Sequence, residues 1–246
     1  MTTQKTPRVA LVTGASGGIG TAVVQKLASE GYSIAVHYAG NQDKADALVK
    51  EITAVGGSAI AVRGDIADET AMQKLFDEVE QKFGGIDVVV NTAGIMILAP
   101  IANYDLDDFD RVIRTNVRGT FVISQQAARR VRSGGAIINF STTVTRTQFP
   151  SYGPYVASKA AVEGMTLILA RELRGKNITV NTVAPGPTAT PLFLDGKDEQ
   201  TVQSLSNAAP LERLGQPEDI AETVANLAGP ARWINGQTIF ANGGLS

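Results

Sequence analysis

The sequence feature that most constrains the fold is a glycine-rich turn near the N-terminus. The apolar residues 9–12 lead into a turn with four glycines, spaced as Gly14-x-x-x-Gly18-x-Gly20, and an amphipathic helix pattern follows over 21–30. Glycine lets a backbone approach a ligand, and a helix start offers free N–H groups and the positive end of a dipole. Strand, turn and helix in this order indicate either a phosphate site or an ordinary βα turn. The spacing differs from the G-x-G-x-x-G pattern of many dinucleotide-binding folds.

Short apolar runs alternate with amphipathic segments along the rest of the chain. Strands are expected at 9–12, 33–38, 58–62, 86–91, 136–140, 179–183 and 237–241, and helices at 21–30, 43–55, 68–83, 107–132, 155–173 and 218–227. Runs that are apolar throughout are typical of strands buried on both faces, and strands that alternate with helices pair in parallel. The sequence therefore predicts an α/β fold: a single domain over 1–246 with a Rossmann-type doubly wound parallel sheet, three layers and about seven strands.

Glycine or polar clusters follow five of the expected strands, at 14–20, 65, 91–94, 141–143 and 185–186. Ligands of doubly wound sheets bind beyond the carboxyl ends of the strands. The clusters therefore predict one ligand site along that edge. The proline-rich stretch 185–217 has no regular pattern, and its part 187–210 is the expected substrate loop, because long irregular segments are commonly lids or binding loops.

Tyr155 and Lys159 form the strongest candidate catalytic pair. They lie four residues apart in an expected helix, so both side chains project from one face. A nearby ammonium favours the phenolate and is expected to lower the pKa of the tyrosine from about 10. Such a tyrosine exchanges protons near neutral pH. A surface tyrosine–lysine pair without function is the alternative.

Four motifs in order carry a family resemblance. They are Thr13-Gly14-x-x-x-Gly18-Ile19-Gly20, Asn91-Thr92-Ala93-Gly94, Tyr155-x-x-x-Lys159 and Pro185-Gly186. Together they resemble the short-chain dehydrogenase/reductase family over essentially the whole chain, and the family pattern T-G-x-x-x-G-x-G accounts for the glycine spacing. The resemblance implies the strand order 3-2-1-4-5-6-7. It also implies an oxidoreductase that transfers hydride between a nicotinamide cofactor and the carbonyl or secondary alcohol of a small molecule.

The resemblance also implies roles for four residues. Tyr155 is expected to protonate the carbonyl oxygen, and Lys159 to lower its pKa and hold the nicotinamide ribose. Asn116 is similar to a family asparagine that holds a proton-relay water, or else it is a helix-interior asparagine bonded to backbone. Thr142 occupies the position, 13 residues before Tyr155, where the family has a serine that binds the substrate carbonyl. Its neighbours Ser141 and Thr143 are alternatives for that contact.

The expected cofactor is NADP(H), with NAD(H) as the alternative. An acidic residue after the second strand would bond the ribose hydroxyl of NAD, and here the first acid is Asp43, already in the next helix. Ser16, His37 and Asn41 can bond a 2′-phosphate, although His37 can equally be a bystander and Asp65 a turn or capping acid. The residues expected to contact the cofactor are Gly14, Ser16, Gly17, Gly18, Ile19, Gly20, His37, Asn41, Asp65, Ile66, Asn91, Ala93, Gly94, Tyr155, Lys159, Pro185, Gly186, Thr188 and Thr190.

Composition narrows the partners. With 22 basic and 24 acidic residues, no cysteine and one histidine, the chain offers little for nucleic acid, an anionic membrane, a metal site or a Ser-His-Asp triad. No apolar run approaches the length of a membrane span or a signal sequence, so a cytoplasmic protein is expected. The family resemblance implies a homotetramer or homodimer, with Trp233-Ile234 and Ile239-Phe240 either in an interface or in a core strand.

The substrate stays open at this point. Residues 191–194 are apolar and can form part of its pocket, and residues 95–98 can add to it or belong to the core. Arg146 is expected to be solvated rather than to recognise a substrate. Alternatives to a ketone reductase are a catalytically silent nucleotide-binding regulator on the same fold and a 3-oxoacyl-thioester or sugar dehydrogenase. A sugar-nucleotide epimerase would need a longer chain, and an enoyl-thioester reductase of this family would carry a wider Tyr-to-Lys spacing.

Overall fold

Seven parallel strands form the centre of the protein, whose computed structural model describes residues 7–246. The strands are β1 (Val9–Thr13), β2 (Ser33–Tyr38), β3 (Ala59–Arg63), β4 (Ile86–Asn91), β5 (Val131–Phe140), β6 (Thr179–Pro185) and β7 (Thr238–Ala241). They pair in the order β3-β2-β1-β4-β5-β6-β7, and every pair is parallel. The expected doubly wound sheet and its strand order are confirmed.

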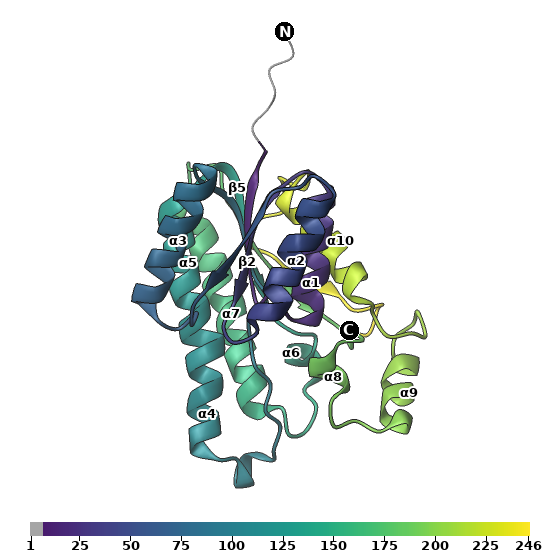
Figure 1. Cartoon of the computed structure of the whole chain (residues 1–246). Coiled ribbons are helices and arrows are strands. Elements are labelled where there is room, and N and C mark those ends of the chain that lie inside the picture. The colour runs from purple at the N-terminus through teal and green to yellow at the C-terminus, as the bar shows by residue number, and fades with distance from the viewer. Residues whose placement is uncertain (1–6) are drawn as a thin grey trace.

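Helices cover both faces of this sheet (Figure 1). On one face lie α1 (Gly18–Ser29), α2 (Gln42–Ala54) and α10 (Pro217–Ala228), and on the other lie α3 (Glu69–Phe83), α5 (Thr120–Arg130) and α7 (Gly153–Glu172). Alternate residues of β1 enter the two cores: Val12 packs with Leu27 of α1, and Leu11 packs with Phe76 of α3. Because both faces are covered, the strand is apolar throughout. None of the helices described within 7–246 is long and apolar enough to span a bilayer.

The prediction of one helix over 107–132 is wrong in two respects. The segment divides into α4 (Leu106–Ile113), the π-helical turn η2 (Arg114–Gly119) and α5, and β5 begins at Val131 instead of residue 136. The first half of β5 lacks an apolar pattern because side-chain ionic contacts hold it. The guanidinium of Arg132 binds the carboxylate of Asp87 on β4, with 2.9 Å between Nε and Oδ1.

The stretch expected to be irregular contains two short helices, α8 (Pro191–Leu194) and α9 (Glu199–Ala208). Thr190 caps α8 and Asp198 caps α9, through side-chain bonds to backbone N–H groups. The ends of the segment meet, since Gly215 N donates to Pro187 O (2.9 Å) and Ala189 N donates to Gly215 O (2.9 Å). The closed segment 187–215 is therefore longer than the expected substrate loop 187–210.

Three smaller elements complete the chain: η1 (Ile101–Asn103), α6 (Val144–Thr147) and the turn that leads into β7. Trp233 lies in that turn and is 100% exposed, so it is not part of a core strand, whereas Ile239 and Phe240 lie in β7. Arg146 of α6 lies over the ring of Phe240, with 3.9 Å from Cζ to the ring centre, so it is packed on an aromatic face.

Candidate active site

The glycine turn after β1 has room only for glycine at several positions. Gly14 has a φ of +64°, and a Cβ there would lie 2.8 Å from the backbone of Ala93. A Cβ at Gly20 would lie 2.3 Å from Gly14 O, and one at Gly18 would lie 2.8 Å from Thr190 Cγ2. The turn is thus packed tightly against the loop after β4 and against the start of α8, which fixes its backbone.

The N-terminus of α1 is prepared for an anion. Within residues 7–246, no side chain caps this helix at Gly17, and its first turn holds no acid. In contrast, α2, α3, α4 and α9 are each capped by an asparagine or aspartate side chain. The free N–H groups of α1 face a cleft whose volume is about 1440 Å³ when its open mouth is included. Free N–H groups and the positive end of the helix dipole together favour an anionic ligand there.

Most residues expected to bind a cofactor line two connected clefts. The larger cleft is lined by Gly14, Ser16, Gly17, Gly18, Ile19, Gly20, His37, Asn41, Asp65, Ile66, Ala93, Gly94 and Thr190. The smaller, of about 700 Å³, is lined by Thr142, Tyr155, Lys159, Pro185, Gly186 and Thr188 among others. Ile19, Gly94 and Thr190 line both, so the clefts are continuous. The residues expected to bind the cofactor therefore lie around one continuous cleft.

His37 does not offer a hydrogen bond to a phosphate, which corrects one of its two expected roles. The ring is 1% exposed, Nδ1 accepts from Gly14 N (3.2 Å) and Nε2 donates to Gly64 O (2.9 Å). Burial lowers the pKa of His37, so the ring is neutral, as this bonding requires. The histidine therefore holds the glycine turn in place.

The side chain of Asn91 is also internal. Its Oδ1 accepts from Thr13 Oγ1 (2.6 Å) and its Nδ2 donates to Thr120 Oγ1 (3.0 Å). The oxygen and the nitrogen of this side-chain amide are therefore both bonded inside the protein. Asn91 reaches a cofactor only through the loop it supports, where Thr92 lines both clefts.

Asn116 lies in the π-helical turn η2 and bonds mainly to backbone. Its Oδ1 accepts from Ile95 N (2.9 Å), and its Nδ2 donates to Ile95 O (2.9 Å) and Ser158 Oγ (3.0 Å). This is the bonding that the alternative interpretation of Asn116 predicted. The asparagine fastens the loop after β4 to α7, and π-helical turns of this kind are frequent at functional sites.

Asp65 serves the loop after β3 and one wall of the larger cleft. Its Oδ1 accepts from Ala67 N (2.9 Å) and its Oδ2 pairs with Arg114 Nη1 (2.7 Å). Burial alone would raise the pKa of Asp65, but these two contacts outweigh it and hold the pKa below its ordinary value. Arg114 lines the same cleft. Nothing in the sequence singled it out, because only the fold brings it to Asp65.

Tyr155 and Lys159 of α7 meet the segment that follows β5. Lys159 Nζ donates to Phe140 O (2.9 Å) and lies 5.8 Å from the ring centre of Tyr155. The hydroxyl of Thr142 faces the phenol of Tyr155 and lowers its pKa, whereas Ser141 donates to Glu163 (2.5 Å) and Thr143 to Ala184 O (3.4 Å). Of the three neighbouring hydroxyls, Thr142 is therefore the one that meets Tyr155.

Sequence comparisons place this site in a known family. A family model described as "Enoyl-(Acyl carrier protein) reductase" matches residues 14–246. A "Short-chain type dehydrogenase/reductase" of Picea abies is 42% identical over 248 residues, covering 96% of this chain and 92% of that protein. The chain belongs to the short-chain dehydrogenase/reductase family. It is therefore an oxidoreductase.

Two further relatives of this dehydrogenase/reductase are similarly close. The 3-oxoacyl-[acyl-carrier-protein] reductase FabG of Staphylococcus aureus (strain Mu50) is 42% identical over 244 residues, covering 98% of this chain and 99% of that protein. A short chain dehydrogenase from Burkholderia cenocepacia J2315, solved in complex with NADP, superposes with a TM-score of 0.91 at 38% identity and covers 98% of both chains.

The pKa values in this dehydrogenase/reductase differ from the sequence expectation. Burial raises the pKa of Tyr155 to about 12, with Tyr152 adding to the rise and the hydroxyl of Thr142 opposing it. Burial lowers the pKa of Lys159 to about 8. The cause is that the same cleft wall removes both groups from water, which penalises each charged form. Tyr155 thus keeps its proton at neutral pH, as an acid that protonates a carbonyl must.

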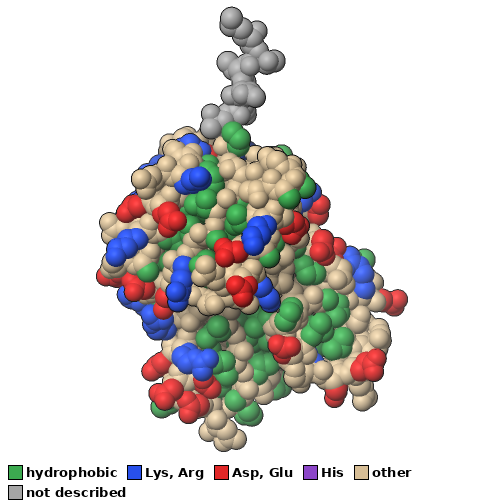
Figure 2. Space-filling model, in the orientation of Figure 1, with side chains coloured by type: hydrophobic (Ala, Val, Ile, Leu, Met, Phe, Trp, Pro, Cys, Tyr) green, Lys and Arg blue, Asp and Glu red, His purple; other side chains and the backbone are tan. Residues whose placement is uncertain are grey.

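The smaller cleft of the enzyme has mostly apolar walls. Three of the apolar residues expected there line it, Met96, Leu192 and Phe193. The other five do not: Ile95, Ile97, Leu98, Pro191 and Leu194. Tyr152 also lines the cleft. Its ring centre lies 6.4 Å from that of Tyr155, edge to face. Figure 2 shows a group of hydrophobic side chains in the lower right, where Figure 1 places α8 and α9.

Proposed function

We propose that this protein is an NADP(H)-dependent reductase of small-molecule ketones, which also oxidises the corresponding secondary alcohols. The observation that carries the proposal is the position of Tyr155, whose protonated phenol meets the hydroxyl of Thr142 in the cleft that joins the larger one. When bound, the nicotinamide supplies the hydride. The protein supplies orientation and a proton.

The residues of the cleft divide this work. The hydroxyl of Thr142 donates a hydrogen bond to the substrate carbonyl oxygen and keeps its proton, and its own oxygen accepts from Val144 N (3.3 Å), which fixes its direction. Tyr155 then gives its phenolic proton to the same oxygen as negative charge develops there. Lys159, with a pKa of about 8, is mostly protonated at pH 7 and stabilises the phenolate left on Tyr155.

The preference for NADP(H) over NAD(H) follows from the ribose end of the larger cleft. Ala39, Gly40 and Asn41 line it there, and the first acid, Asp43, lies within α2. An acid at this edge would repel a 2′-phosphate. The Burkholderia relative, solved with NADP, supports the same choice. We expect NADPH to bind more tightly than NADH in fluorescence titrations, and tighter binding of NADH would overturn this preference.

The substrate that fits best is small, uncharged and partly apolar. Among the described residues that line the smaller cleft, Lys159 is the charged side chain, and it is already bonded to Phe140 O. A substrate carboxylate or phosphate would therefore find little compensation there. A 3-oxoacyl thioester is the second candidate, favoured by the 42% identity to FabG.

The test is consumption of NADPH by the purified protein against a panel of ketones, keto esters, sugars and a 3-oxoacyl thioester. We expect turnover of at least one neutral ketone, and Tyr155→Phe should lower kcat by roughly 10²-fold or more while NADPH still binds. Tyr38→Phe is the control, which should retain turnover because Tyr38 lines neither cleft. Wild-type turnover in Tyr155→Phe would refute the mechanism. Binding of NADPH without any turnover would favour a nucleotide-binding regulator.

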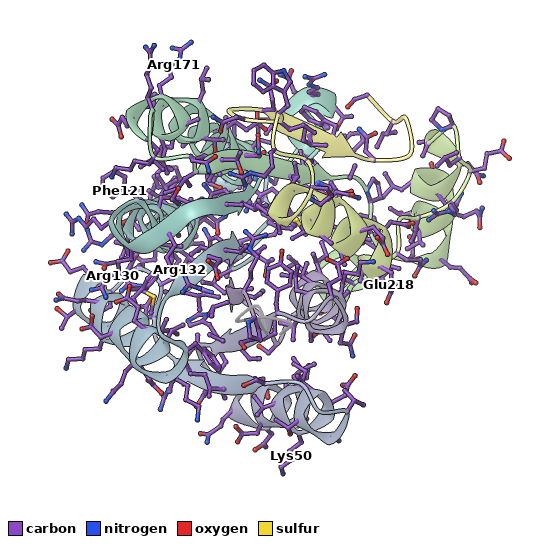
Figure 3. The ribbon with its side chains drawn as sticks, turned by 90° about the horizontal axis from the view of Figure 1, so that it is seen from above. Lys50, Phe121, Arg130, Arg132, Arg171 and Glu218 are labelled. Carbon is purple, nitrogen blue, oxygen red and sulfur yellow. The ribbon has the colours of Figure 1, made fainter. Side chains whose placement is uncertain are left out.

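We also propose a homotetramer, with a homodimer as the alternative. Phe121 of α5 and Ile168 of α7 are 54% and 58% exposed on the outer face of the helix layer, and Figure 3 shows Phe121 pointing outward there. Exposed apolar side chains grouped on a helical face are typical of an interface. Light scattering of the purified protein measures its mass and so tests the proposed tetramer.

A cytoplasmic location stays a prediction.

A further inference from the structure

Three side chains of α7 fasten the segment that follows β5. Tyr155, Lys159 and Glu163 are spaced by four residues, so they lie on one face of the helix. Tyr155 contacts Thr142, Lys159 contacts the carbonyl of Phe140, and Glu163 contacts the hydroxyl between them, Ser141. The first two contacts belong to the mechanism proposed above. The third has no role in it.

Glu163 is an unusual member of this row because it is a partly buried carboxylate held by hydroxyls. Its Oε1 accepts from Ser141 Oγ (2.5 Å) and from Thr145 Oγ1 (3.0 Å). In the part of the chain that the structure describes, no lysine or arginine forms an ion pair with it. Withdrawing a carboxylate from water without a cation is unfavourable, and bonds from hydroxyls to a charged oxygen are the strong kind.

The contact decides what Ser141 can offer to a substrate. A hydroxyl has one proton to donate, and that of Ser141 is directed to Glu163. Ser141 lines the smaller cleft beside Thr142, so without Glu163 the cleft would present two hydroxyl donors to one carbonyl oxygen. Thr142 is arranged differently: its oxygen accepts from Val144 N, and its proton faces Tyr155 in the cleft instead of a carboxylate.

We propose that Glu163 is a positioning residue that makes Thr142 the one aliphatic hydroxyl that donates to the substrate carbonyl beside Tyr155, by holding the proton of Ser141. This inference rests on the proposed ketone reductase function. A second donor displaced by one residue would bind the carbonyl in a competing position, away from Tyr155. Glu163 therefore affects both the rate and the face of the carbonyl that is reduced.

The test compares Glu163→Ala, Glu163→Gln and the double variant Glu163→Ala/Ser141→Ala, using the ketone that the wild type reduces best. We expect Glu163→Ala to lower kcat roughly tenfold and to reduce the enantiomeric excess of the alcohol, since a misdirected donor loses stabilisation of the developing oxyanion. Glu163→Gln keeps an acceptor oxygen for Ser141 and should stay close to the wild type. The double variant, which removes the competing hydroxyl, should recover both rate and selectivity.

Controls separate this role from a structural one. Glu78→Ala, at an exposed position of α3, should match the wild type, and thermal melting checks that each variant is folded. A loss in Glu163→Ala that the double variant does not restore would mean that Glu163 only supports the fold, and would overturn the inference. Unchanged rate and selectivity in Glu163→Ala would do the same while leaving the ketone reductase function intact. A wild type without turnover would instead refute the proposed function, and this inference with it.

Discussion

Replacing Lys159 with methionine should abolish turnover and yet stabilise the protein. Lys159 is 5% exposed, and burial lowers its pKa from 10.5 to about 8. At about 1.4 kcal/mol per pKa unit, burying the charged form costs about 3 kcal/mol below pH 8. The variant loses the hydrogen bond to Phe140 O, which is worth about 1 kcal/mol. The net expectation is a gain of about 2 kcal/mol in the free energy of unfolding at pH 7, or about 4–8 °C in Tm for a chain of this size.

The dependence on pH identifies the cause of this gain. Between about pH 8 and 10.5 the unfolded wild type binds more protons than the folded one, so wild-type stability rises with pH through this window. Methionine does not titrate, so the advantage of the variant should shrink as the pH rises. Urea unfolding of both proteins at pH 7 and pH 9.5 measures it. A variant that is no more stable at pH 7, or whose advantage does not change with pH, would show that the ammonium is not desolvated as described.

Further predictions concern the glycine turn, the Asp65 pair and the outer helical face. Gly14→Ala should lower the free energy of unfolding by about 2 kcal/mol or more, since φ is +64° and the Cβ would meet Ala93 at 2.8 Å; unchanged urea unfolding would contradict this. Arg114→Ala should cost under about 1 kcal/mol, because both partners of the Asp65 pair are about half exposed, and a larger loss on melting would indicate a buried pair. Ile168→Glu should shift the protein to a smaller species in light scattering, and an unchanged mass would place the interface elsewhere.

The parts of the fold that the sequence predicts are those governed by local patterns. Strands such as β1 and β4 are apolar throughout because both faces are buried, and the glycine turn after β1 requires residues without a Cβ. The first half of β5 was not predicted because it has no apolar periodicity. It is held instead by an ion pair between residues distant in sequence, Arg132 and Asp87. The break at η2 was not predicted because a π-helical turn leaves the helical pattern of apolar residues almost unchanged.

At the site, the residues were easier to predict than their contacts. The spacing of Tyr155 and Lys159 shows that they share a helix face, but their pKa values depend on how deeply both are buried. The use of both nitrogens of His37 depends on Gly64 coming close in space. The proposed choice of Thr142 over Ser141 depends on Glu163, which lies 22 residues after Ser141 and one turn of α7 beyond Lys159. Each of these is a long-range contact that no local pattern encodes.

The closed ends of segment 187–215 have a consequence for how such an enzyme diversifies. The backbone bonds between Pro187, Ala189 and Gly215 tie the two ends of the segment together, so its length can vary without moving the points where it joins β6 and α10. Loop closure costs only about 0.6 kcal/mol for each doubling of length, so evolution can lengthen, shorten or exchange the interior at little cost to stability. The proposed catalytic residues lie outside segment 187–215: Thr142, Tyr155 and Lys159. The catalytic residues can therefore stay in place while the segment that contacts the substrate is exchanged. Replacing residues 191–213 with the corresponding segment of a relative is the matching route to a new substrate range.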